Sequence, residues 1–173
     1  MKFFFIKENK NITNLPQIIN WNKVINPTYL KYGEYYNIPK RNLINIKSDK
    51  NVIFPDLLFH PFFMISKNVK EVLDMFEPNQ VYKEIILLDG KNELMQLYYL
   101  PVLREYNCMA EGTEYNLDKS IIKHGILDTA KIEDKCIFKV SNVKNSHIIA
   151  RLDFIESILR RGFILDVTEL EIK

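Results

Sequence analysis

The residue types that most often carry out chemistry in proteins are few in this chain and far apart. Its three histidines are His60, His124 and His147, and its two cysteines are Cys108 and Cys136. None of them stands in the H-x-x-x-H, H-E-x-x-H or C-x-x-C spacing that lets a short segment hold zinc or form a redox pair. The sequence therefore predicts no metal site and no bound cofactor.

Nucleophilic catalysis would need a cysteine or histidine beside a group that activates it. Cys108 is the candidate nucleophile, with His124 or His147 as its base, but its neighbours in the sequence are uncharged and would not stabilise a thiolate. His60 has only Asp56 as a nearby carboxylate. A small cysteine in a packed core and a hydrogen-bonded histidine are the simpler interpretations, and no catalytic residue is predicted.

Glycine and charge patterns argue against two further kinds of site. The five glycines are isolated, and none begins a G-x-G-x-x-G or G-x-x-x-x-G-K-S/T loop, whose backbone amides hold phosphate groups. Lys and Arg number 24 and Asp and Glu number 22, which gives a net charge of +2. Binding to a nucleic acid needs a concentrated basic face instead of this near balance. We therefore expect no nucleic-acid partner.

The clearest candidate binding site is an aromatic group made of Trp21, Tyr29, Tyr32, Tyr35 and Tyr36. Prolines interrupt this part of the chain, and neither helical nor strand spacing is sustained in it. Tyr and Trp provide a large contact area at a small cost in entropy and are enriched at interface hot spots. The same rings could instead anchor a long loop to the core. Tyr35 and Tyr36 are expected to be the exposed pair, because a Gly-Glu turn precedes them.

Length and composition favour a single globular domain covering residues 1–173. A chain of this size buries about 70% of the surface that its unfolded state exposes, and a hydrophobic content of 47% is ordinary. The apolar run at 54–65 is too short and too broken by Pro, Asp and His to span a bilayer, and the apolar run at the N-terminus is too short for a signal peptide. We expect a cytoplasmic protein with two free thiols and no membrane contact.

The elements expected around these residues form an α+β domain with a largely antiparallel sheet and two main packed helices. The first helix is predicted at 66–76, with Ser66 as its N-cap and apolar residues at helical spacing behind it. The second is predicted at 153–161, because Asp153 and Glu156 have the spacing of a capping box. The residues expected on the buried faces of these helices include Leu73 and Leu159.

The strands are predicted from alternating or continuous apolar runs. Residues 81–89 and 93–103 indicate a hairpin of two long strands with both faces covered. Residues 126–132 and 135–140 indicate a second hairpin. Further strands are expected at 2–7, 42–47, 146–150 and 163–172. Residues 1–50 are otherwise poorly patterned and predict loop with short helical or strand pieces.

Four segments share their pattern with a known protein family. They are FFMISKNVKEVLDMF, LYYLPVLREYNCM, CIFKV and HIIARLDFIESILRRGFILDVTEL, which lie within residues 54–170. In this pattern the chain resembles the Imm11-type immunity proteins, a family of bacterial proteins associated with polymorphic toxin systems. Ala150 and Arg151 stand where a serine cap is expected before the second helix. The resemblance implies a non-enzymatic cytoplasmic protein that binds a cognate protein toxin and neutralises it.

Charge and the remaining patterns define this expectation further. Inhibitors of very basic nucleases tend to be strongly acidic, so a net charge of +2 argues against such a nuclease as the toxin. One alternative is an enzyme with a pocket built from His60, Cys108 and His124. Another is a structural subunit that forms a homo-oligomer through an exposed edge strand at 2–6 or 163–170. The chain is expected to be either a monomer or a homodimer.

Overall fold

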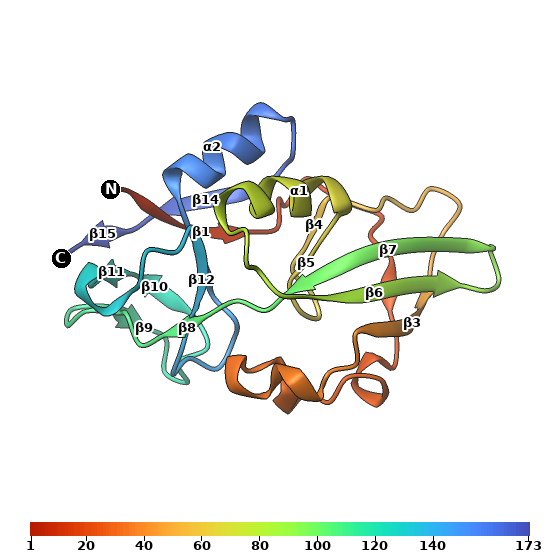
Figure 1. Cartoon of the computed structure of the whole chain (residues 1–173), viewed down its shortest axis with the longest axis horizontal. Coiled ribbons are helices and arrows are strands. Elements are labelled where there is room, and N and C mark those ends of the chain that lie inside the picture. Colours follow the sequence, from red (N-terminus) through yellow and green to blue (C-terminus); the bar gives the residue numbers. More distant parts are fainter. The chain divides into compact units, whose positions relative to one another are not determined.

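The computed structural model describes all 173 residues, and the chain folds as two compact units (Figure 1). Unit 1 comprises Met1–Lys7 and Leu103–Lys173, and unit 2 comprises Glu8–Val102. Each unit contains one α-helix and a larger proportion of strands, so the expected mixture of helix and sheet is confirmed. None of the helices has the length and apolar composition needed to cross a bilayer.

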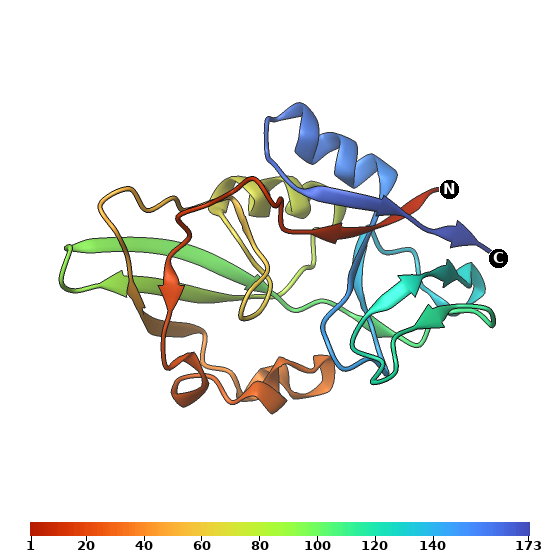
Figure 2. The same cartoon turned by 180° about the vertical axis from the view of Figure 1, so that it is seen from behind.

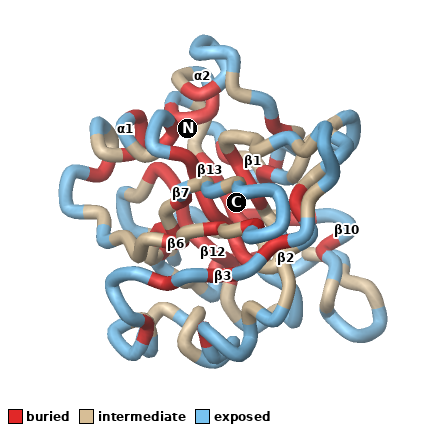
Figure 3. The backbone as a smooth tube through the Cα atoms, turned by 90° about the vertical axis from the view of Figure 1, so that its right-hand side faces the viewer, coloured by how far each residue is buried: buried red, intermediate tan, exposed pale blue.

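Unit 1 is built on a five-stranded sheet in the order β14-β1-β13-β12-β8. Its strands are β1 (Phe3–Lys7), β8 (Glu105–Tyr106), β12 (Ile137–Val140), β13 (Ile148–Arg151) and β14 (Asp166–Glu169). Neighbouring strands are antiparallel except β12 and β8, and β12 and β13 are buried along their lengths (Figure 3).

The position of β1 corrects the prediction of an exposed edge at residues 2–6. This strand pairs with β13 on one side and with β14 on the other, as Figure 2 shows for the red and dark blue strands. Of the two candidate edges only β14, within 163–170, lies at the margin of the sheet. The aromatic residues Phe3 and Phe5 are buried, which explains why this strand is central.

The remaining elements of unit 1 are β9 (Glu114–Tyr115), β10 (Ile122–His124), β11 (Ile126–Leu127), β15 (Glu171–Ile172) and the 3-10 helix η4 (Thr129–Lys131). β9 pairs with β10, and β11 pairs in parallel with β15. The predicted hairpin of 126–132 and 135–140 is therefore wrong, because β11 and β12 belong to different sheets. Asp128 ends the first segment by capping η4, with its carboxylate accepting from Ala130 N.

Helix α2 (Leu152–Arg160) corrects the predicted capping box. Its N-cap is Arg151, which makes no side-chain capping bond, and Asp153 lies inside the helix. The Asp153 carboxylate accepts hydrogen bonds from Arg151 Nε at 2.8 Å and from Phe154 N at 2.9 Å. The helix buries Phe154, Ile155 and Ile158, whereas Leu159, predicted to be in the core, is 46% exposed. One residue along a helix turns the side chain by about 100°, so Leu159 leaves the buried face.

Unit 2 is built on a six-stranded sheet in the order β2-β3-β6-β7-β5-β4. Its strands are β2 (Gln17–Ile18), β3 (Arg41–Lys47), β4 (Leu57–Leu58), β5 (Met64–Ile65), β6 (Tyr82–Asp89) and β7 (Leu94–Pro101). Only β3 and β6 run parallel. β6 and β7, drawn in green in Figure 1, confirm the first predicted hairpin.

The two faces of this sheet are covered unequally. One face packs on a core that includes Ile44, Ile85, Leu87 and Tyr98, with the chain around Ile25 and Ile38 completing the cluster. On the other face Leu43, Met95 and Leu97 are exposed. The prediction that both faces of the hairpin are covered is therefore wrong for its outer half, where burial alternates along each strand.

Helix α1 (Lys67–Phe76) confirms the first predicted helix and its cap. Ser66 Oγ accepts a hydrogen bond from Val69 N at 3.3 Å and donates one to Asp56 Oδ1 at 2.6 Å. The helix buries Val69, Val72 and Leu73, as their spacing predicts. The N-terminal part of unit 2 also contains the short pieces expected there: the 3-10 helices η1 (Trp21–Lys23), η2 (Pro27–Leu30) and η3 (Tyr32–Asn37).

Candidate functional site

Three of the predicted aromatic residues form one cluster on η3, which we call the tyrosine surface: Tyr32, Tyr35 and Tyr36. A 3-10 helix has three residues per turn, so Tyr32 and Tyr35 lie one above the other, with ring centroids 5.9 Å apart. The rings of Tyr35 and Tyr36 are 6.5 Å apart and nearly perpendicular, at 73°. Tyr36 is 68% exposed, whereas Tyr32 and Tyr35 are half-buried. The expectation that both Tyr35 and Tyr36 are exposed therefore holds fully only for Tyr36.

The end of η3 is held by strand β6. Lys83 Nζ donates a hydrogen bond of 2.6 Å to Ile38 O, and the same ammonium lies 5.8 Å from the centroid of the Tyr35 ring. Ile38 follows η3 and is buried. Within η3, Asn37 Nδ2 donates to Glu34 Oε2 at 3.0 Å. These contacts fix the backbone beneath the tyrosine surface, so its rings are presented with little freedom left to lose on binding.

The other two aromatic residues have an anchoring role. Trp21 and Tyr29 are half-buried and pack against the core of unit 2. The Trp21 ring meets that of Phe62 edge to face, with centroids 5.5 Å apart. The predicted group of five thus divides into two rings that secure the N-terminal segment and three that gather at the surface.

The candidate nucleophile Cys108 is placed for packing. Its side chain is fully buried, and burial raises the pKa of its thiol to about 11. The thiolate is the reactive form, and at neutral pH almost none of it is present here. Cys136, the second cysteine, is buried as well.

The histidines have structural partners or lie in solvent. His147 Nε2 is 3.0 Å from Ser120 O, its ring lies 5.7 Å from that of Phe5, and burial lowers its pKa. His124 Nε2 is 3.3 Å from Glu171 Oε1 on the surface. His60 is exposed in the turn before Pro61.

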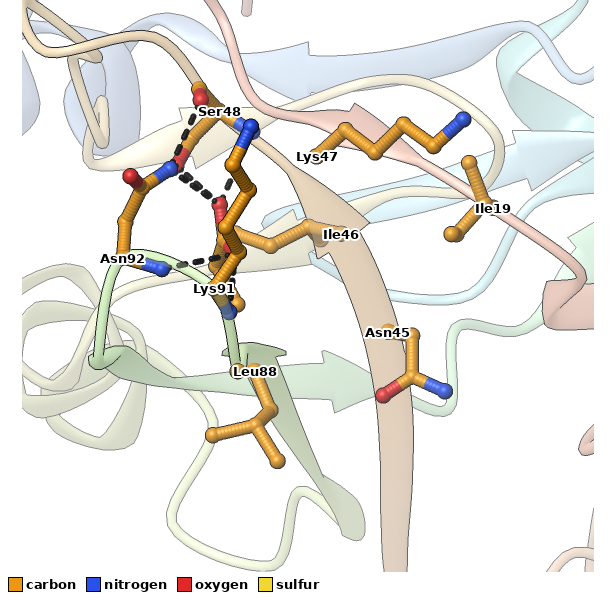
Figure 4. A pocket seen from close by; sticks show the side chains of 10 residues that line it. Ile19, Asn45, Ile46, Lys47, Ser48, Leu88, Lys91 and Asn92 are labelled. Carbon is orange, nitrogen blue, oxygen red and sulfur yellow. Dashed lines mark hydrogen bonds between the residues drawn. The ribbon is translucent and has the colours of Figure 1, made fainter.

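No three or more His, Cys, Asp and Glu side chains are grouped so that they could hold a metal ion. No protein-family model, curated protein or solved structure matches the chain. A further feature with the form of a site is an open pocket of about 530 Å³ at the tip of the β6–β7 hairpin (Figure 4). Its lining includes Asn45, Lys47, Leu88, Lys91 and Asn92.

Asp89 lines this pocket and is almost fully buried. Its carboxylate accepts from Ser48 Oγ and Ser48 N, from Asn92 Nδ2 and Asn92 N, and from Lys91 N. These bonds, those from Ser48 and Asn92 first, hold its pKa far below the ordinary range. This pocket was not predicted from the sequence. Its only local signal is the Asp-Gly-Lys-Asn turn, because Ser48 comes from a distant loop.

Proposed function

We propose that this protein is an immunity protein of the Imm11 type, which binds a cognate bacterial toxin through the tyrosine surface and neutralises it without chemistry of its own. The observation that supports the proposal most directly is the exposed ring of Tyr36 beside Tyr32 and Tyr35. Aromatic side chains on a fixed backbone are the usual anchors of protein interfaces, since they bury much area and lose little entropy.

The net charge of the protein points to a partner that is not strongly basic. The chain carries a net charge of +2, which provides no attractive field for a cationic toxin. Lys83 adds a cation directly beneath the Tyr35 ring. The contact is therefore driven by ring burial at its centre, with charge acting at the rim.

Co-expression with the product of the gene immediately upstream tests this proposal. The wild-type protein should restore viability and copurify with that product. The double substitution Tyr35→Ala and Tyr36→Ala should abolish protection and weaken the complex by at least about tenfold, which corresponds to about 1.4 kcal/mol. Its melting temperature should stay within a few degrees of the wild-type value, because the rings do not belong to the core.

Met75→Ala is the matched control, since Met75 is also a large exposed side chain of unit 2 at 60% exposure. It should protect as well as the wild type does. Failure of the wild type to protect or to form a complex would refute the proposed function. A large loss of thermal stability in the double variant would instead assign Tyr35 and Tyr36 to loop anchoring.

A further inference from the structure

The uncovered side of the unit 2 sheet carries a continuous apolar area, which we call the open sheet face: Leu43, Ile86, Leu88, Met95 and Leu97. Strand register places Leu43, Ile86 and Leu97 in one row across β3, β6 and β7. The next row is Asn45, Leu88 and Met95. Paired residues point to the same side of a sheet, so the two rows form one surface.

At one end of this side of the sheet, next to helix α1, the side chains contact one another or the helix. Arg41 Nε and Glu84 Oε2 form an ion pair of 2.6 Å across β3 and β6. Beside it, Lys70 of α1 lies 4.5 Å from the Tyr82 ring and 5.6 Å from the Tyr99 ring. Lys70 of α1 therefore lies over the rows of Tyr82 and Tyr99, which precede the open sheet face.

The two open rows retain much of their contact with solvent. Leu43 is 51% exposed, Met95 70% and Leu97 37%. Single exposed apolar residues are common on proteins, but a cluster of them in register on adjacent strands is typical of an interaction surface.

The open sheet face runs directly into the pocket at the hairpin tip. Asn45 and Leu88 belong to its last row and also line the pocket. Beyond them the pocket is lined by Lys47 and Lys91, while the one carboxylate among the lining residues, Asp89, is occupied by its five hydrogen bonds (Figure 4). An apolar strip thus ends in a polar hollow that is lined by two ammonium groups.

We propose that the open sheet face and this pocket bind an acidic segment of the protein partner, with apolar side chains on Leu43, Met95 and Leu97 and carboxylates beside Lys47 and Lys91. This inference rests on the proposed function. It adds that the toxin has an acidic contact region. Charge complementarity selects that partner, because a basic segment would bring like charges against the two lysines.

The open sheet face is distinct from the tyrosine surface. Lys83, which reaches Tyr35, alternates along β6 with Glu84 and Ile86, so its side chain leaves the opposite face of the sheet. β2 pairs only with Ile46 and Lys47, so the rest of β3 lies at an edge of the sheet. A partner that contacts both surfaces therefore passes around this edge. Each surface can be removed by substitution without changing the other.

The dye anilinonaphthalene sulfonate provides a test that needs no partner, because it combines apolar rings with an anionic group. It should bind the folded wild-type protein. Leu43→Ser with Leu97→Ser should weaken its binding by about tenfold, a change of about 1.4 kcal/mol. Lys47→Gln with Lys91→Gln should weaken it less and reduce its dependence on salt. Met75→Ser is the control and should bind as the wild type does. Equal binding by all variants, or none by the wild type, would overturn the proposed surface.

The same variants in the co-expression assay separate the two proposals. If the wild type protects and the leucine and lysine double variants do not, while their melting temperatures are unchanged, the acidic segment of the toxin is bound here. If these variants protect fully, the inference is wrong and the proposed function stands. If the wild type neither protects nor forms a complex, the proposed function fails, and the assignment of an acidic toxin to this surface fails with it.

Discussion

Lys83 Nζ donates a hydrogen bond of 2.6 Å to Ile38 O, so a strand of the sheet holds the carbonyl that follows η3. The distance in sequence between the two residues makes this a tertiary contact, whereas the bonds within η3 are local. A six-residue 3-10 helix is long for its type, because the geometry of its hydrogen bonds is poor. Lys83 is therefore expected to contribute to the rigidity of the tyrosine surface, together with the buried Ile38.

Lys83→Met tests that contribution. The substitution keeps most of the aliphatic side chain and removes the donor, so the free energy of unfolding should fall by about 1–3 kcal/mol. Amide hydrogen exchange in residues 32–38 should become faster, and partner binding should weaken. Lys91→Met, on the exposed hairpin turn, is the control and should change neither stability nor exchange in that segment. Unchanged exchange in Lys83→Met would show that η3 is held by other contacts.

The two adjacent residues Ile158 and Leu159 provide a test of the register of α2. Ile158 is 1% exposed and Leu159 is 46% exposed. Ile158→Ala should lower the free energy of unfolding by about 2–5 kcal/mol, as in other buried large-to-small substitutions. Leu159→Ala should lower it by less than about 1 kcal/mol. Leu73→Ala in α1 should resemble Ile158→Ala, because Leu73 is also 1% exposed. Urea unfolding of the three variants would decide, and the reverse order for Ile158 and Leu159 would contradict the register.

The difference between the two helices shows what the sequence can predict. α1 begins at a serine whose hydroxyl accepts from Val69 N, so cap and apolar spacing agree and both boundaries are recovered. α2 has no side-chain cap. There Asp153 has the spacing of a capping residue but is recruited by Arg151, which also binds Asp134. Whether Asp153 caps the helix or pairs with Arg151 depends on the tertiary structure, and the local sequence pattern does not show it.

The candidate sites show the same limit. Residue type alone identified the aromatic group, but it could not separate the three tyrosines of η3 from Trp21 and Tyr29, which pack against the core. The open sheet face could not be identified, since IILL and LYYL have the composition of strands buried on both sides. Nothing in the sequence indicates that α1 leaves the rows of Leu43 and Asn45 uncovered. The pocket was equally hidden, because Asn92 binds Ser48 from 44 residues away.

Cys108 should be chemically silent in the folded protein. Burial raises the pKa of its thiol to about 11 and also blocks access, and Cys136 is 1% exposed. Neither thiol should react with iodoacetamide at about pH 8, where a free thiol of pKa about 8.5 reacts readily, and both should react once guanidinium unfolds the chain. Mass spectrometry after timed alkylation measures this directly. Rapid modification of Cys108 in the native protein would revive the enzyme alternative, in which it was the candidate nucleophile.

Asp89 predicts how stability depends on acid. Hydrogen bonds, from Ser48 and Asn92 first, lower its pKa in the folded state below the value of about 3.9 that an unfolded chain has. A lowered pKa means that the unfolded state binds the proton more tightly, so the contribution to stability is complete above about pH 4. It is lost progressively as the pH falls below that value. The Asp89→Asn variant lacks this carboxylate and should be less stable than the wild type at neutral pH, with a deficit that shrinks in acid.

Urea unfolding of the wild type and of Asp89→Asn across the acid range measures this difference, and the subtraction cancels every group that titrates alike in both proteins. Asp118 is a suitable comparison, because hydrogen bonds from Ser120 and Lys144 also lower its pKa, to about 2. Asp118→Asn should show a similar but smaller convergence with the wild type. A deficit in Asp89→Asn that stays constant from neutral pH into acid would mean that the carboxylate charge does not hold Ser48 to the hairpin tip. The pocket beside the open sheet face would then be formed by the turn alone.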